Sequence, residues 1–303
     1  PWQVRRDGDF LYGRGVEDNQ QAIVSMLLLA EEVLSQGITP ELSLGLVFMA
    51  DEETGSLYGL EHLLNTAPHF FNPDDLYIVP DAGSSKGDVI EIAEKSQLWL
   101  KVQTTGIQCH GSTPQKGRNA FLAGADMALS CHNALRSAFA DANPLFDPPY
   151  STFVPGKHEA NVPNINTVPG NDVFYIDCRL LPHVDMDSVL AKMREVAAEV
   201  AEKHTVQIQV SVVQRQDATA IPQTGTVVTA LKAAIARIYG VQAQAVGIGG
   251  ATVAAFLRQK GLPAAVWGCL ENTCHQPDER SSITATIKDS QVFAHILMNA
   301  AHV

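Results

Sequence analysis

Three consecutive carboxylates, Asp51, Glu52 and Glu53, follow an apolar stretch at residues 42–50 of this 303-residue chain. Like charges at the end of a buried strand repel one another and lose hydration, and a bound cation is the commonest remedy. A solvated acidic loop is the alternative, because runs of charge usually face solvent. The triplet alone leaves both interpretations open.

Short apolar strands alternate with helical patterns through the first hundred residues. The expected strands cover residues 10–15, 42–50 and 76–79, and the expected helices cover residues 20–36 and 58–64. This alternation predicts an α/β fold with a mostly parallel sheet and helices on both faces. Sites in such sheets lie beyond the carboxyl ends of the strands. Asp18, the acidic triplet and Asp81 each follow a different expected strand, so these acids should converge on one edge.

The pattern changes near residue 98. Leu98, Leu100 and Val102 alternate with residues of an exposed face, which suits an antiparallel sheet. The elements expected next are a helix at 119–136, strands at 165–168 and 172–180, a helix at 186–203 and a strand at 206–213. This is the ferredoxin-like order. The predicted domains are therefore residues 1–97 and 217–303, which form one domain, and residues 98–216, which are inserted into it.

The last part of the chain returns to the first pattern. Helices are expected at 227–238, 251–259 and 287–299, and a strand at 264–268. His275 lies between that strand and the final helix. Carboxylates with an imidazole and no thiolate suit Zn, Mn or Co in a hydrolytic site with open positions. Because neighbouring side chains point apart, one of Glu52 and Glu53 can bind a metal while the other holds a water.

Composition excludes several classes of protein. The net charge of −12 repels nucleic acid and anionic membranes, and no apolar run approaches the ~20 residues of a membrane span. The five cysteines are widely spread with no CxxC pair, which argues for a reducing compartment and a cytoplasmic protein. The chain begins at Pro1 rather than Met, so we expect it to be the N-terminally incomplete part of a longer protein.

The order of the motifs resembles that of the co-catalytic di-zinc metallopeptidases and deacylases. This family includes carboxypeptidase G, succinyl-diaminopimelate desuccinylase, acetylornithine deacetylase, aminoacylase and carnosine dipeptidase. The similarity covers nearly the whole chain, and its motifs are GRGVEDNQ, DEETGS, PDAG, CHGSTPQKGRNA, NTVPG, DCR, GGATVAA and CHQPDE.

The resemblance implies a role for each matching residue. Asp18 would bridge two divalent metals, zinc first with Mn or Co as alternatives. Glu53 and His275 would complete one metal site, and Asp81 would bind the other metal. Glu52 would be the general base for a bridging water. The family also implies a cis peptide between Asp18 and Asn19.

The resemblance assigns further roles to the inserted domain, as a lid and dimerisation domain. His110 would steady the oxyanion, in many members from the other subunit of a homodimer. The residues implied to bind substrate are Asn166, Arg179, Arg215, Gly249 and Gly250.

Two departures from the family pattern bear on activity. The family's second metal also needs a histidine from a His-x-Asp motif upstream of the region where this chain starts, so this chain should hold that metal poorly. Val253 stands where several relatives have an acid or arginine. Asp81, where an aspartate accompanies dipeptidases and aminopeptidases, favours cleavage of a small peptide.

Three alternatives stay open or are discounted. An N-acyl amino acid deacylase such as acetylornithine deacetylase or desuccinylase is the first. A non-catalytic binding relative is the second, although the retained Glu52 argues against it. A cysteine hydrolase built on Cys109 and His110 is discounted, because adjacent residues point apart and the acids would be unexplained.

Overall fold

The computed structural model describes residues 2–299. The chain divides into two units. The first unit comprises residues 1–93 and 220–303, and the inserted unit comprises residues 94–219. Each unit is described by itself below.

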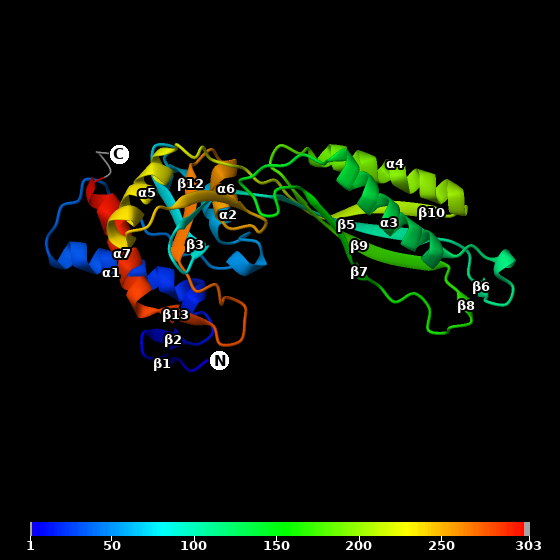
Figure 1. Ribbon diagram of the computed structural model, residues 1–303, viewed down its shortest axis with the longest axis horizontal. Coiled ribbons are helices and arrows are strands. Elements are labelled where there is room, and N and C mark those ends of the chain that lie inside the picture. Colours follow the sequence, from blue (N-terminus) through cyan, green and yellow to red (C-terminus); the bar gives the residue numbers. More distant parts are fainter. Residues whose placement is uncertain (1, 300–303) are drawn as a thin grey trace. The chain divides into compact units, whose positions relative to one another are not determined.

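A four-stranded sheet forms the centre of the first unit (Figure 1). Its strands, in spatial order, are β11 (Gln244–Ile248), β4 (Val89–Glu94), β12 (Ala264–Cys269) and β3 (Tyr77–Ser84). Strand β12 runs parallel to β3 and antiparallel to β4. A smaller antiparallel sheet contains β1 (Arg5–Asp7), β2 (Phe10–Tyr12) and β13 (Arg280–Ser282).

Helices cover both faces of the central sheet, as predicted. The helices are α1 (Ala22–Ser35), α2 (Leu60–Thr66), α5 (Thr226–Tyr239), α6 (Ala254–Gln259) and α7 (Ile283–Asn299). Neighbouring residues of β12 show the two faces, because side chains alternate along a strand. Val266 packs in the core formed with α2 and α6. The Trp267 ring lies 6.0 Å from that of Tyr239 on α5 and 5.6 Å from that of Phe293 on α7.

The inserted unit has the ferredoxin-like architecture that the sequence predicts. Its sheet contains, in spatial order, β10 (Gln207–Gln216), β5 (Ser96–Thr105), β9 (Asn171–Leu180) and β7 (Thr152–His158), all antiparallel. Helices α3 (Ala120–Ala138) and α4 (Met186–His204) pack on it. Leu98, Leu100 and Val102 are fully buried in this core, so the predicted alternation is confirmed.

The strand predicted at residues 42–50 is wrong. This segment is irregular, and Leu44, Val47 and Phe48 are exposed. A strand is stable only when its backbone groups pair with a neighbour. No such neighbour pairs with the segment among residues 2–299, and an apolar stretch alone does not make a strand.

The second strand of the ferredoxin-like order was also misplaced. The segment expected at 165–168 forms only β8 (Thr167–Val168), which pairs with β6 (Cys109–His110) outside the main sheet. Strand β7 takes its place in the main sheet and contains Pro155 and Gly156. Proline is tolerated there because β7 is an edge strand.

Two further expectations concern redox state and membranes. All five cysteines lie among the described residues, and each is a free thiol. In the same part of the chain, every helix is too short or too polar to cross a membrane.

Candidate metal centre

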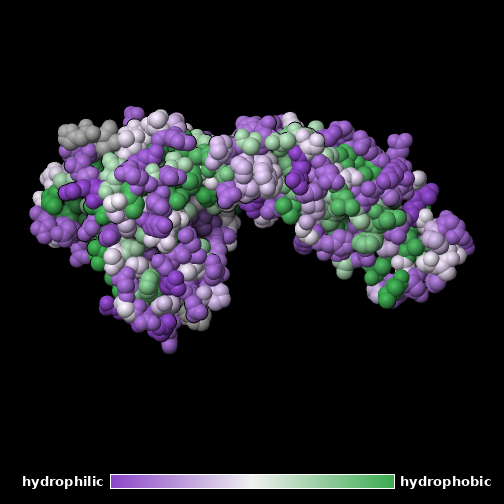
Figure 2. Space-filling model, in the orientation of Figure 1, coloured by the Kyte–Doolittle hydropathy of each residue, from purple (hydrophilic) through white to green (hydrophobic). Residues whose placement is uncertain are grey.

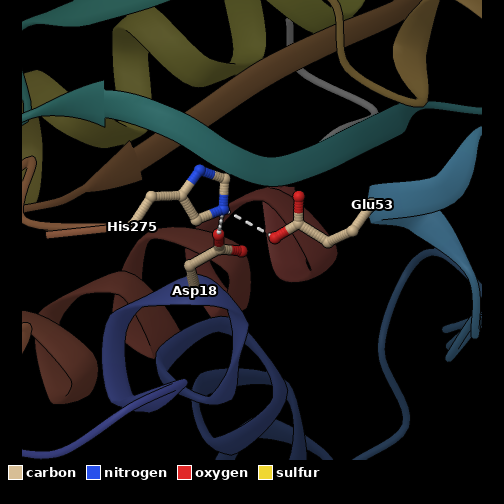
Figure 3. Close-up of side chains that lie close together, drawn as sticks. All are labelled: Asp18, Glu53 and His275. Atoms are coloured by element: carbon tan, nitrogen blue, oxygen red, sulfur yellow. Dashed lines mark hydrogen bonds and ion pairs between the residues drawn. The ribbon is translucent and has the colours of Figure 1, made fainter.

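Asp18, Glu53 and His275 meet at one point of the first unit, although they are far apart in the sequence (Figure 3). The His275 Nε2 atom lies 3.0 Å from the Asp18 Oδ2 atom and 2.6 Å from the Glu53 Oε1 atom. One potential ligand atom from each side chain lies within 4.8 Å of the others. This is the only such group of three or more among residues 2–299.

Three irregular segments supply these side chains. Asp18 lies in a π-helical turn, η1 (Val16–Gln21), whose Asp18–Asn19 peptide bond is cis, as the resemblance implies. Glu53 lies in a 3-10 turn, η2 (Glu52–Thr54). His275 follows β12 in a loop and has a positive φ of 59°. Irregular backbone of this kind concentrates at functional sites.

The charges at this point are balanced only in part. The hydrogen bond and charge of Glu53 raise the pKa of His275. Burial and the charge of Glu53 raise the pKa of Asp18. A second positive charge would therefore be favoured at this position.

Glu52 and Asp81 extend the acidic cluster. Burial, followed by repulsion from Asp81, raises the pKa of Glu52 to about 7. Burial, followed by repulsion from Asp18, raises the pKa of Asp81 to about 6. The Asn19 Nδ2 atom donates to the Asp81 Oδ1 atom at 3.2 Å. Asp81 lies within β3, whereas the sequence placed it beyond a strand that ends at residue 79.

The donor set fits a divalent cation. Two carboxylate oxygens and an imidazole nitrogen already point at one another, which is the arrangement that a borderline metal such as Zn²⁺ uses. A cavity of about 120 Å³ lies beside them and is lined in part by Asp18, Asp81 and Cys274. Asp81 and Asp18 could hold a second cation there.

His110 and Asn166 lie together in the inserted unit. The Ser112 N–H donates to the His110 Nδ1 atom at 3.2 Å. The Ser112 Oγ atom also lies 2.8 Å from Nδ1, which leaves the Nε2 atom as the other polar atom of the ring. The Asn166 amide lies 3.4 Å from that Nε2 atom.

The predicted arginines of the inserted unit contact acids of the same unit. The Arg179 Nε atom on β9 donates to Asp177 at 2.9 Å. The Arg215 Nη1 atom on β10 donates to Asp187 at 2.7 Å. In the first unit, Gly249 and Gly250 follow β11, and a Cβ atom added at Gly249 would meet nothing within 4 Å.

Two buried carboxylates beside the cluster were missed by the sequence interpretation. Glu17 and Glu279 are each 3% exposed. Both stand within the motifs that carry Asp18 and His275, but a motif does not show which acids turn away from the ligands. The available signal was that each motif contains acids beyond those that the ligand set needs: Glu17 in the first motif, and Asp278 and Glu279 in the second.

An α/β unit with histidine and carboxylates converging on one point defines a metal-dependent hydrolase class. The family model described as "Peptidase family M20/M25/M40" matches residues 1–299, so the chain belongs to this family of metallohydrolases.

Curated relatives agree with this membership. An uncharacterized metallohydrolase of Methanocaldococcus jannaschii is 40% identical over 304 residues, which cover 97% of this chain and 74% of the relative. An uncharacterized metallohydrolase of Methanococcus maripaludis is 38% identical over 311 residues, which cover 98% of this chain and 75% of the relative. A succinyl-diaminopimelate desuccinylase of Bordetella parapertussis is 24% identical over 298 residues, which cover 98% of this chain and 76% of the relative.

Solved structures share the fold. A tripeptidase of Staphylococcus aureus has a TM-score of 0.79 at 18% identity, covering 99% of this chain and 77% of that one. The aminopeptidase PepT of Bacillus cereus has a TM-score of 0.78 at 17% identity, and the match covers 99% of this chain and 76% of that one. These likenesses confirm the α/β fold with its inserted unit.

Proposed function

We propose that this metallohydrolase cleaves the amide bond of a small peptide or N-acyl amino acid, with Glu52 as the general base. The observation that carries the proposal is the convergence of Asp18, Glu53 and His275 on one point, beside which Glu52 stands in a cluster of acids with a metal-free pKa raised to about 7. A general base works best when its pKa lies near the operating pH.

The acids and the histidine would divide into ligands and base. Asp18, Glu53 and His275 would hold one divalent cation, and Asp18 and Asp81 a second, with zinc as the first choice. Cations held there would polarise the scissile carbonyl and lower the pKa of a water. The second cation has fewer ligands from this chain, so we expect weaker binding of that ion.

Glu52 would move one proton in each turnover. It would accept the proton of the attacking water and pass it to the leaving amine nitrogen, which is the usual route of general acid–base catalysis. Glu53 cannot share this task, because its Oε1 atom faces the His275 Nε2 atom at 2.6 Å.

The inserted unit would supply the contacts to the substrate. A ring N–H of His110 would donate to the oxyanion. Asn166 and Arg179 would hold the substrate, and the backbone at Gly249 and Gly250 would contact its carboxylate. Arg215 would first have to leave Asp187.

Asp81 favours peptides over N-acyl amino acids as substrates. The solved structures of a tripeptidase and an aminopeptidase accord with this choice at the level of fold. Deacylation is the second candidate, and the relative described as a desuccinylase favours it. A binding protein without activity is the third candidate, but such a protein has no use for a base beside its ligands.

Glu52→Gln tests the proposal in full-length protein. We expect this variant to retain its metal, measured by elemental analysis, and to lose turnover by orders of magnitude on a panel of dipeptides and N-acyl amino acids. Glu61→Gln on α2 is the matched control and should keep wild-type activity. Undiminished turnover in Glu52→Gln would show that the base is elsewhere, and the preferred panel member identifies the substrate class.

We also propose that the protein forms a homodimer through the inserted unit. Strand β7 is an edge of the sheet, and Val154 on it is exposed. Leu122 and Leu129 on the neighbouring helix α3 are 57% and 67% exposed. An unpaired edge beside apolar side chains is a common interface. The opposite edge, β10, is accompanied by α4 with exposed charges such as Glu195.

Sedimentation tests the interface. Leu129→Lys should convert a dimer into a monomer, because a charge would be buried at the contact. Val213→Lys, at an exposed position on β10, is the matched control and should stay dimeric. A wild-type protein that sediments as a monomer would refute the proposal.

A further inference from the structure

Glu17 and Glu279 are buried carboxylates that contact the segments carrying the proposed ligands but do not join the ligand group. Each is 3% exposed, and neither belongs to the Asp18, Glu53 and His275 cluster. Burying a carboxylate is costly unless it is hydrogen-bonded, so each must have partners. Those partners link the two loops of the site.

Glu279 holds the backbone that precedes and includes Asp18. Its Oε1 atom accepts from the backbone N–H groups of Glu17 at 3.1 Å and Asp18 at 3.2 Å. Its Oε2 atom accepts from the Arg14 Nη1 atom at 2.7 Å. The position of the Asp18 backbone is thus set by a residue four positions after His275.

Glu17 holds the loop that carries His275. Its Oε1 atom accepts from the Asn272 N–H at 2.9 Å. Its Oε2 atom accepts from the Thr273 N–H at 2.6 Å and the Thr273 Oγ1 atom at 2.7 Å. The loop therefore donates three hydrogen bonds to a residue next to Asp18.

The two sets of contacts are reciprocal. Each acid lies close in sequence to one proposed ligand and holds the backbone near the other. The loop needs such ties, because Asn272, His275 and Asp278 all have φ near +60°, a region that non-glycine residues rarely adopt. An isolated loop would not keep three such residues in place.

We propose that Glu17 and Glu279 are positioning residues that fix the separation of Asp18 and His275 for metal binding. This inference rests on the proposed metal site and adds the residues that preorganise it. Groups that orient metal ligands typically change metal affinity by about 10–100-fold when they are removed. Neither acid contacts the metal or the substrate in this account.

Cobalt binding to the full-length protein tests the inference. Glu17→Gln and Glu279→Gln each replace an acceptor oxygen by an amide N–H that faces other N–H donors. We expect each variant to bind Co²⁺ about 10–100-fold more weakly, with an altered visible absorption spectrum. Glu271→Gln is the matched control, because Glu271 lies in the same loop and, within residues 2–299, accepts from the Arg280 side chain alone, at 2.9 and 3.1 Å.

A merely structural role predicts a different pattern. It would lower the urea midpoint measured in chelator but leave the affinity and the Co²⁺ spectrum of the folded protein unchanged, and that result would overturn the inference. Thr273→Val is the milder variant in case the glutamine variants do not fold. It removes one hydrogen bond to Glu17, together with the contacts of the Thr273 hydroxyl with the Arg280 backbone, and Co²⁺ binding at least about fivefold weaker is expected.

The outcomes also separate this inference from the function on which it rests. If the wild-type protein binds no Co²⁺, the proposed metal site is wrong and this inference fails with it. If the wild type binds Co²⁺ tightly and the variants, including Thr273→Val, bind it equally tightly, the metal site stands and the positioning role is refuted.

Discussion

Asp289 on α7 should make the stability of the first unit depend on pH. The side chain is 3% exposed, and burial raises its pKa to about 7. The Tyr239 Oη atom donates to it at 2.7 Å, and the Cys269 N–H and Gln21 Nε2 atoms donate at 3.3 Å. These three donors offset burial only in part, so the folded protein holds the proton that the unfolded chain releases near pH 4.

The sign and size of the effect follow from linkage. Between pH 4 and 7 the unfolded state binds fewer protons than the folded state, so the free energy of unfolding falls as pH rises. Moving the pKa of Asp289 from 3.8 to about 7 lowers the free energy of unfolding by at most about 4 kcal/mol between pH 4 and pH 7. Below pH 4 and above pH 7 this contribution is constant. Asp289→Asn, a neutral side chain of the same shape, should remove the slope.

Urea denaturation of the wild type and of Asp289→Asn from pH 4.5 to 8 would measure this pH dependence of the free energy of unfolding. Trp267 is fully buried and close to Tyr239, so its fluorescence reports on this unit once Trp2 and Trp99 are replaced by phenylalanine. Chelator keeps metal out of both proteins. Glu52 and Asp81 titrate in the same range but contribute equally to both, so the difference between wild type and variant isolates Asp289. A difference that is constant across this range would refute the reasoning.

Three further predictions concern packing and metal. Arg258→Ala should lower the free energy of unfolding by about 3–5 kcal/mol in urea denaturation, because it breaks a buried ion pair in which the Arg258 Nη1 atom lies 2.8 Å from Glu91. Arg136→Ala, at an exposed position, is the control and should lower it little. Gly83→Ala should disrupt the pairing of β3 with β12 and lower the thermal midpoint, because the new Cβ would lie 1.9 Å from the Gly268 carbonyl oxygen. Adding Zn²⁺ should raise the thermal midpoint and chelator should reverse the rise, and His275→Ala should abolish the response.

The sequence predicts a strand or helix correctly when the pattern of apolar residues in that segment is enough to show which side is buried. The alternation of Leu98, Leu100 and Val102 identified β5 because one face of that strand is buried and the other is not. Residues 42–50 form an apolar stretch that also predicted a strand, yet Phe48 is exposed and no strand forms, because pairing depends on a neighbour that the stretch does not specify. Strand β7 was missed because Pro155 reads as a breaker, and its place at an edge is a property of the whole sheet.

The sequence singled out the acids and the histidine that meet in the candidate site, but not the residues that hold their backbone in place. Asp18, the acidic triplet and His275 could be proposed because each follows an expected strand or glycine-rich segment. The resemblance then singled out Glu53 within the triplet, and the structure brings Asp18, Glu53 and His275 together. The contact of Arg215 with Asp187 could not be foreseen, because it depends on which face of β10 meets the start of α4. For the same reason the sequence gives no indication that Glu17 and Glu279 turn toward backbone N–H groups.

The carboxylates near the candidate site differ in their hydrogen-bond partners. Glu279 accepts from backbone N–H groups and Arg14, and its pKa is lowered despite burial. Glu52 and Asp81 lack such a set of donors, and burial with mutual repulsion raises their pKa values to about 7 and about 6. A carboxylate already matched with donors gains little from a cation, whereas a cluster with raised pKa values gains much. The donors around Glu279 thus suit a carboxylate that holds backbone, whereas a nearby cation would stabilise the cluster that contains Glu52 and Asp81.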